Sequence, residues 1–168
     1  MHKVVVNQED LKKEVEQEME KIQHKKNTIP IEIKANIWDK YDLDKQIEKI
    51  QDRKIWLNCG GFITIDKTEA LTAIDVNSGK YTGRKNLEET VLKVNEEASK
   101  EIAKQLRLRD IGGIIMIDFI DMQEEESRRK IVQLLEESLK EDRSKTQIVE
   151  FTKLSLLEMT RKHIWNHP

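Results

Sequence analysis

The hydrophobic positions follow a helical period most clearly in the middle of the chain. One apolar stripe is spaced for a long amphipathic helix and consists of Leu87, Val91, Val94, Ala98, Ile102 and Leu106. Asn86 is suited to be its N-cap, and Glu89 stands three residues later, as in a capping box. This pattern predicts a helix from about Asn86 to Leu108, which Asp110 and the following glycines end.

Shorter periodic segments predict further elements on both sides of this helix. Helices are expected around Leu11–Ile22, Leu43–Ile50 and Ile131–Leu139. Strands are expected at Val4–Val6, Ile29–Ile33, Ile55–Leu57, Phe62–Ile65, Ala70–Val76, Ile114–Ile117 and Gln147–Phe151. The uninterrupted apolar run Ile114–Ile117 is typical of a strand covered on both faces. The fold class is therefore α/β (α+β), with a mixed sheet and helices on its faces, and the pattern changes near Lys54.

Two of the expected strands end in an aspartate. Asp75 follows the segment Leu71-Thr72-Ala73-Ile74, and Asp118 follows Ile114–Ile117, with the long helix between them. A strand, helix, strand order implies a parallel crossover, so both aspartates should emerge at the same carboxyl edge of the sheet. If the strands are neighbours about 4.8 Å apart, the two carboxylates can reach one ion.

Such a pair suits Mg²⁺, which takes one or two carboxylates together with waters and phosphate oxygens. The alternative is that Asp75 and Asp118 are ordinary turn or cap residues at strand ends, because aspartate is common there. Asn77, two residues after the first aspartate, adds weight to the metal interpretation. Composition and spacing leave both interpretations open.

Composition narrows the class of protein only partly. The 30 Lys and Arg residues nearly balance the 32 Asp and Glu residues, for a net charge of −2. This balance argues against a dedicated nucleic-acid binder, although not against a nuclease whose metal ion supplies positive charge. The single cysteine, Cys59, excludes an internal disulfide, and no zinc is expected in this chain. No apolar run approaches the roughly 20 residues of a membrane span, so we expect a soluble, cytoplasmic protein.

Two longer segments resemble signatures of the ribonuclease E/G family of endoribonucleases. They are residues 68–79, which contain Asp75 and Asn77, and residues 107–122, which contain Asp118. Shorter family-like segments are Gly60-Gly61, Glu88–Thr90 and Leu156–Arg161, in the same order and nearly without gaps. The resemblance implies a deoxyribonuclease I-like catalytic subdomain over residues 53–168, preceded at residues 1–52 by part of a ribonuclease H-like segment.

The resemblance also implies an activity and a site. Asp75 and Asp118 are similar to the family's Mg²⁺ ligands, for which Mn²⁺ can substitute, and Asn77 matches an asparagine that supports the second aspartate. The implied reaction is endonucleolytic hydrolysis of single-stranded, AU-rich RNA in RNA processing and decay, leaving 5′-phosphate and 3′-hydroxyl ends. A homo-oligomer is left open, and no membrane partner is expected.

Other family features have no counterpart in these 168 residues. They are the OB-fold RNA-binding insert, the 5′-end-sensing segment and the cysteine pair of the intersubunit zinc link. We therefore expect either an excised fragment or a minimal form, with weak activity by itself. A non-catalytic RNA-binding or assembly module is the alternative.

Basic and aromatic residues are the remaining candidates for RNA contact. Lys80, Arg84 and Lys85, in the loop before the long helix, are expected to contact RNA phosphates, unless this is simply a solvated loop. Lys145 is a further candidate for the RNA backbone, like Lys153, with a plain charged surface as the alternative. Trp38, Trp56 and Trp165 are too scattered in sequence to indicate a stacking platform and are interpreted as core or interface residues.

Overall fold

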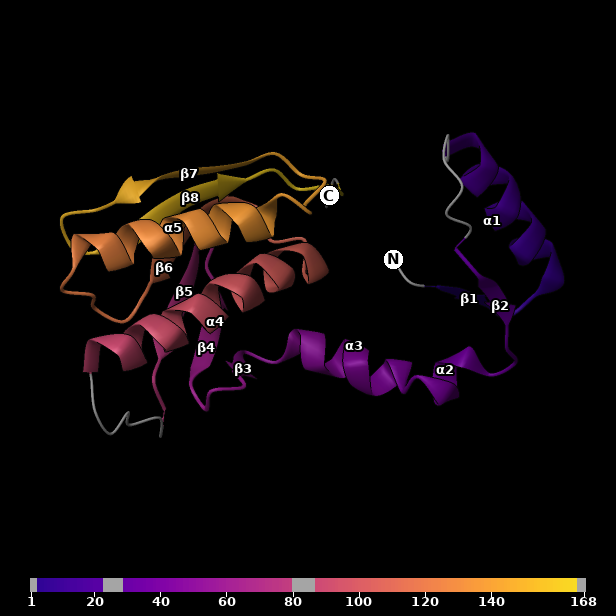
Figure 1. Ribbon diagram of the computed structural model, residues 1–168, viewed down its shortest axis with the longest axis horizontal. Coiled ribbons are helices and arrows are strands. Elements are labelled where there is room, and N and C mark those ends of the chain that lie inside the picture. Colours follow the sequence, from indigo (N-terminus) through magenta and orange to yellow (C-terminus); the bar gives the residue numbers. More distant parts are fainter. Residues whose placement is uncertain (1–2, 23–28, 80–86, 166–168) are drawn as a thin grey trace. The chain divides into compact units, whose positions relative to one another are not determined.

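The structure is a computed structural model that describes residues 3–22, 29–79 and 87–165 (Figure 1). The chain divides into two compact units, residues 1–49 and residues 50–168. Each unit is described by itself. Within the described residues, no helix is both long and apolar enough to cross a membrane.

The first unit is built around a pair of short parallel strands. Its elements are β1 (Val4–Val6), α1 (Glu9–Ile22), β2 (Ile31–Ile33), α2 (Ile37–Lys40) and the start of α3 (Leu43–Gln51). The predicted strands and the helices α1 and α3 are confirmed, whereas the four-residue helix α2 was not expected. The resemblance of residues 1–52 to a ribonuclease H-like segment stays a prediction.

The second unit contains one mixed, six-stranded sheet with the strand order β3-β4-β5-β6-β8-β7. The strands are β3 (Lys54–Trp56), β4 (Phe62–Lys67), β5 (Thr72–Asn77), β6 (Gly113–Asp118), β7 (Thr146–Phe151) and β8 (Leu156–Arg161). Only β5 and β6 pair in parallel, as the predicted crossover requires, and the other neighbours are antiparallel. The mixed sheet of the predicted fold class is confirmed. Strand β8 was not predicted, although it separates β6 from β7.

Two long helices, α4 (Leu87–Leu108) and α5 (Glu125–Leu139), lie side by side on one face of this sheet (Figure 1). The helix stripe predicted from the sequence faces the sheet, since Val94, Ala98, Ile102 and Leu106 are fully buried. The inward residues of the strands complete the core and include Ile63, Ile74, Ile115, Ile117, Leu157 and Met159. The predicted N-cap Asn86 lies outside the described residues.

The expectation that Ile114–Ile117 is covered on both faces is wrong. Ile115 and Ile117 are fully buried, but Ile114 is 51% exposed and Met116 is only half-buried. The strand therefore alternates, because both long helices lie against the same side of the sheet. We call the other side, away from α4 and α5, the open face.

A buried ionic cluster joins the ends of α4 and β8 at the amino end of β6. Asp110 ends α4 in a left-handed conformation with φ 45°, and the N–H of Ile111 donates to the carbonyl of Leu106, as in a Schellman motif. The Arg161 guanidinium, with no exposed surface, donates to Asp110 at 2.8 Å and to Asp142 at 2.8 Å. Asp110 also accepts hydrogen bonds from the backbone N–H groups of Ile164 and Trp165, so the cluster holds these two residues beside the end of α4.

Candidate active site

Asp75 and Asp118 lie directly opposite each other on neighbouring parallel strands. They are register partners of β5 and β6, and Asp118 is the last residue of its strand. Both side chains are exposed on the open face, because their chain neighbours Ile74, Val76 and Ile117 turn into the core. With strands about 4.8 Å apart, the two carboxylates are close enough to share one ion. The predicted meeting of the two aspartates at one edge of the sheet is therefore confirmed as a matter of topology.

The electrostatics of this pair show that the carboxylates oppose each other. The pKa of Asp118 is raised above its ordinary value by partial burial, and then by the negative charges of Asp75 and Asp121. Repulsion of this kind is what a divalent cation would relieve, since it favours the ionised form of both groups. The pair therefore fits a metal ion better than it fits two independent cap residues.

Asn77 is hydrogen-bonded to the first aspartate, Asp75. Its Nδ2 donates to Oδ2 of Asp75 at 2.6 Å, because residues two apart on a strand share a face. This hydrogen bond holds Oδ2 of Asp75 toward Asn77. The other carboxylate oxygen of Asp75 is therefore directed away from Asn77. That this asparagine also supports the second aspartate, Asp118, stays a prediction.

A buried asparagine that sequence reasoning missed positions the segment after Asp118. Asn95, with no exposed surface on α4, accepts from the N–H of Ile120 at 3.1 Å and donates to the carbonyl of Ile120 at 2.8 Å. It thereby fastens the chain between Asp118 and Asp121 to the helix. A polar residue in the middle of the apolar stripe was the signal in the sequence.

Asp121 lies before α5 and is not its N-cap. Helix α5 begins at Glu125, and its N-cap is Glu124, whose side chain makes no capping hydrogen bond. Asp121 instead lies close enough to Asp118 for its charge to raise the pKa of that carboxyl. It is the third acidic residue of this edge, spaced three residues after Asp118.

Glycines bring two loops together beside the site. Gly79, with φ 60°, lies so close to the β3–β4 turn that a Cβ there would be 2.5 Å from the carbonyl oxygen of Gly60. A Cβ on Gly61 would be 2.8 Å from the carbonyl oxygen of Asn77. Gly61 and Gly79 therefore let the turn pack against the end of β5.

The donor set is suited to Mg²⁺ rather than to a metal enclosed by protein ligands. Among residues 3–22, 29–79 and 87–165, no group of three or more His, Cys, Asp or Glu side chains is placed to hold a metal. Mg²⁺ usually keeps several waters and binds through one or two carboxylates with phosphate oxygens. Asp75 and Asp118 would be these two carboxylate ligands.

None of the four basic residues predicted to bind RNA is placed at the site by the structure, which describes one of them. Lys80, Arg84 and Lys85 lie outside the described residues. Lys145 immediately precedes β7. The first residue of β7, Thr146, is the register partner of Arg161, which in turn pairs with Gly113 at the start of β6. The length of β6, about 17 Å at 3.3 Å per residue, separates that end from Asp118, so Lys145 is not brought to the site.

Lys153 lies at the opposite end of the same hairpin and is the better placed of the two lysines. It belongs to the turn between β7 and β8, next to Leu156, which is the register partner of Asp118. Its side chain is exposed. The sequence left the two lysines equivalent, because the order of β6, β8 and β7 was not known.

Comparison with known proteins shows the family of this chain. The profile of the ribonuclease E/G family matches residues 1–164. The chain is 49% identical to ribonuclease G of Salmonella typhimurium (strain SL1344) over 126 residues, which are 75% of this chain and 26% of that protein. It is 45% identical to ribonuclease E of Escherichia coli (strain K12) over 128 residues, 76% of this chain and 12% of that protein. The chain thus spans about a quarter of the length of the ribonuclease G relatives that it matches.

Proposed function

Because this chain belongs to the ribonuclease E/G family, we propose that it carries the catalytic centre of a Mg²⁺-dependent endoribonuclease. The substrate is single-stranded, AU-rich RNA, hydrolysed at its phosphodiester bonds during RNA processing and decay. One observation carries the proposal: Asp75 and Asp118 are register partners on parallel strands, on a face that the long helices leave open.

Four residues of the chain would each have a role at this site. Asp75 and Asp118 hold the ion, and Asn77 keeps Asp75 in one orientation. When bound, Mg²⁺ supplies positive charge against the phosphate oxygens and makes a water more acidic for in-line attack. Asn95 keeps the segment after Asp118 in place, so that the second carboxylate stays opposite the first.

The proposed activity depends on pH through Asp118. Its pKa is raised by burial and by the charges of Asp75 and Asp121, so protonation competes with metal binding at a higher pH than for an ordinary aspartate. Activity should therefore rise with pH as the Asp118 carboxyl ionises.

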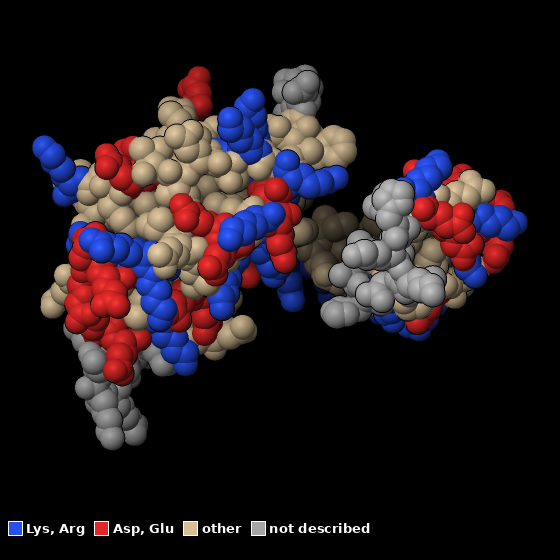
Figure 2. Space-filling view, turned by 45° about the horizontal axis from the view of Figure 1, so that its top comes forward, with Lys and Arg blue, Asp and Glu red and all other residues tan. Residues whose placement is uncertain are grey.

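A second candidate is a non-catalytic RNA-binding or assembly module. The acidic first turns of α4 and α5, with Glu88, Glu89, Glu125 and Glu126, favour an assembly role, because their carboxylates repel RNA phosphates. Lysine and arginine side chains are interspersed with acidic ones over the visible face (Figure 2). This mixed surface predicts weak RNA affinity for the chain by itself.

The test is cleavage of an AU-rich single-stranded RNA by the full chain, with Mg²⁺ and with chelator. Asp75→Asn and Asp118→Asn should each abolish metal-dependent cleavage. Asp66→Asn is the matched control, because Asp66 lies on the same face of β4 and pairs with Arg53 at 2.6 Å. Cleavage that survives either site substitution, or that is indifferent to chelator, contradicts the two-aspartate site. Binding without cleavage would favour the second candidate.

A further inference from the structure

An aromatic pair lies on the edge of the sheet, outside the core. Trp56 on β3 is 62% exposed, and its ring meets the ring of Phe62 on β4 edge to face, with the centroids 5.3 Å apart. The ammonium of Lys54 lies 4.1 Å from the centroid of the Trp56 ring and 3.6 Å from that of Phe62. Of the two roles predicted for Trp56, core or interface, the exposed side chain contradicts the core and leaves the interface as a prediction.

This aromatic group shares the open face with the candidate metal site. Register partners across a sheet point to the same side, and Trp56, Phe62 and Asn77 form one row of partners across β3, β4 and β5. The next row is Lys54, Thr64, Asp75 and Asp118. Trp56 is thus two strand spacings, about 10 Å, from Asn77 along the sheet.

The chemistry of the group matches one kind of ligand. Proteins that hold single-stranded nucleic acid combine aromatic rings, on which bases stack, with cations that follow the backbone. Lys54 supplies the cation and also holds the two rings together through cation–π contacts. A large aromatic side chain left mostly in water loses the favourable free energy of burial, which a stacked base would restore.

We propose that Trp56, Phe62 and Lys54 form a stacking platform for a nucleobase of single-stranded RNA. The inference rests on the proposed function, because the base belongs to the strand whose phosphate lies at Asp75 and Asp118. Trp56 offers the stacking surface, Phe62 braces the indole, and Lys54 faces the sugar–phosphate backbone. The row of partners that ends at Asn77 sets the distance between the platform and the metal site.

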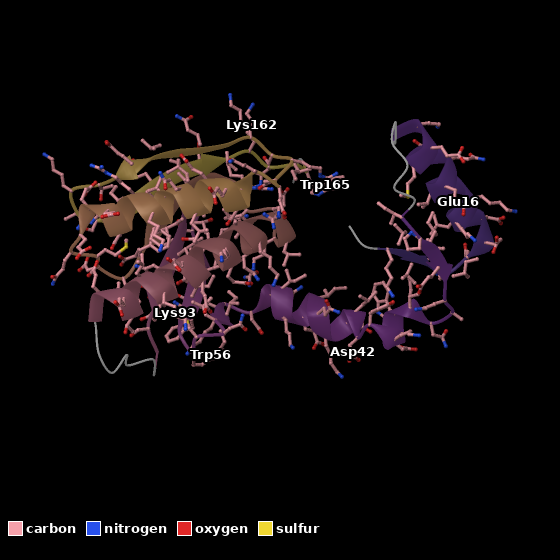
Figure 3. The ribbon with its side chains drawn as sticks, in the orientation of Figure 1. Glu16, Asp42, Trp56, Lys93, Lys162 and Trp165 are labelled. Carbon is pink, nitrogen blue, oxygen red and sulfur yellow. The ribbon has the colours of Figure 1, made fainter. Side chains whose placement is uncertain are left out.

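Binding of a labelled, AU-rich single-stranded RNA to the full chain in chelator tests the platform without cleavage. Trp56→Ala should weaken binding by about tenfold, within the range expected for one base–aromatic stack. Trp56→Tyr should retain most of the affinity. The control is Trp165→Ala, because Trp165 is 65% exposed and lies at the other end of the unit from Trp56 (Figure 3). Its backbone N–H donates to Asp110, a bond that the substitution retains.

A second readout locates the base. In a chain with Trp38→Phe and Trp165→Phe, Trp56 is the remaining tryptophan of the three, and its fluorescence should be quenched by RNA. An abasic position moved along the RNA should weaken binding at one place only. At that place Trp56→Ala should have no further effect, because the stacking partner is already missing.

The outcomes separate the platform from the proposed function. If the chain cleaves RNA with Mg²⁺ while Trp56→Ala binds RNA as the unchanged chain does, the platform is wrong and the proposed function stands. If the unchanged chain neither binds nor cleaves RNA, both are wrong. A change in sedimentation on Trp56→Ala, with RNA affinity unaltered, would show a protein-docking face and would also overturn the platform.

Discussion

Asp75 and Asp118 face each other as register partners on the two parallel strands of an otherwise antiparallel sheet. Like charges directly opposite on neighbouring strands destabilise a sheet, so this arrangement costs stability in the absence of a cation. The pKa of Asp118 reflects this unfavourable arrangement. Burial raises that pKa, and the negative charges of Asp75 and Asp121 raise it further. The predictions below follow from this relationship and from the contacts that support it.

Asp118→Asn should stabilise the metal-free chain near neutral pH, by about 0.2–1 kcal/mol in the free energy of unfolding. Because the pKa of Asp118 is raised on folding, its neutral form stabilises the folded chain below the ordinary aspartate pKa. That contribution is lost as the pH rises through the raised pKa. Urea unfolding with chelator across this range should show the advantage of the variant appearing with rising pH and vanishing in acid. A constant difference at all pH values would contradict the assignment.

Mg²⁺ should stabilise the unchanged chain against heat. A ligand that binds only the folded state at a hundred times its Kd adds about 2.7 kcal/mol. Thermal unfolding with increasing Mg²⁺ should therefore raise Tm for the unchanged chain and for Asp66→Asn, but not for Asp75→Asn or Asp118→Asn. A Tm increase in all four proteins would indicate nonspecific screening by the salt.

Asn77→Ala should weaken Mg²⁺ binding by about 10- to 100-fold, because the substitution removes the hydrogen bond that orients Asp75. The free energy of unfolding should change little, since the amide is only half-buried. Mg²⁺ affinity can be taken from the Tm titration above. An unchanged affinity would mean that the Asp75 carboxylate is held by its strand alone.

Asn95→Ala should destabilise the fold by at least about 2 kcal/mol, because it leaves the N–H and the carbonyl of Ile120 without their buried partner. Mg²⁺ affinity should fall as well, since the segment after Asp118 is released. Ser99→Ala is a suitable comparison on the same helix: Ser99 is also fully buried, but bonds only within α4. Equal effects of the two substitutions on Mg²⁺ affinity would argue against a positioning role for Asn95.

Arg161→Met should be the most destabilising of these changes, at about 3–5 kcal/mol, because it removes the buried cation that faces the carboxylates of Asp110 and Asp142. Burial alone would raise the pKa of Asp110, but hydrogen bonds from Arg161 and from the backbone of Trp165 and Ile164 lower it well below its usual range. The contribution of this carboxylate is therefore present above the ordinary aspartate pKa and is lost in acid.

Urea unfolding of Arg161→Met should be compared with that of Arg129→Met, whose exposed ion pair with Glu125 should cost less than about 1 kcal/mol. Similar losses for the two variants would show that the buried cluster contributes no more than a surface pair.

Several parts of the fold followed from local patterns. The stripe of α4 and the apolar strands β5 and β6 are periodic over enough residues to predict both the elements and their parallel crossover. Strand β8 was missed although Leu157, Glu158, Met159 and Thr160 alternate between apolar and polar, which is the pattern of a half-buried strand. The open face was missed because a run of apolar residues does not reveal whether Ile114 is covered.

The sequence alone predicted which two aspartates meet, because each lies at or near the end of a strand and the two strands flank one long helix, an order that implies a parallel crossover. The tertiary structure decided everything that depends on strand order and on the side that the helices cover. It assigned Asn77 to Asp75, placed Lys145 at the far end of the sheet and Lys153 near Asp118, and left Trp56 exposed beside Phe62. The reason is physical: periodicity reports whether a side chain alternates with its neighbours along one strand, whereas its partners on other strands are set by the packing of the whole sheet.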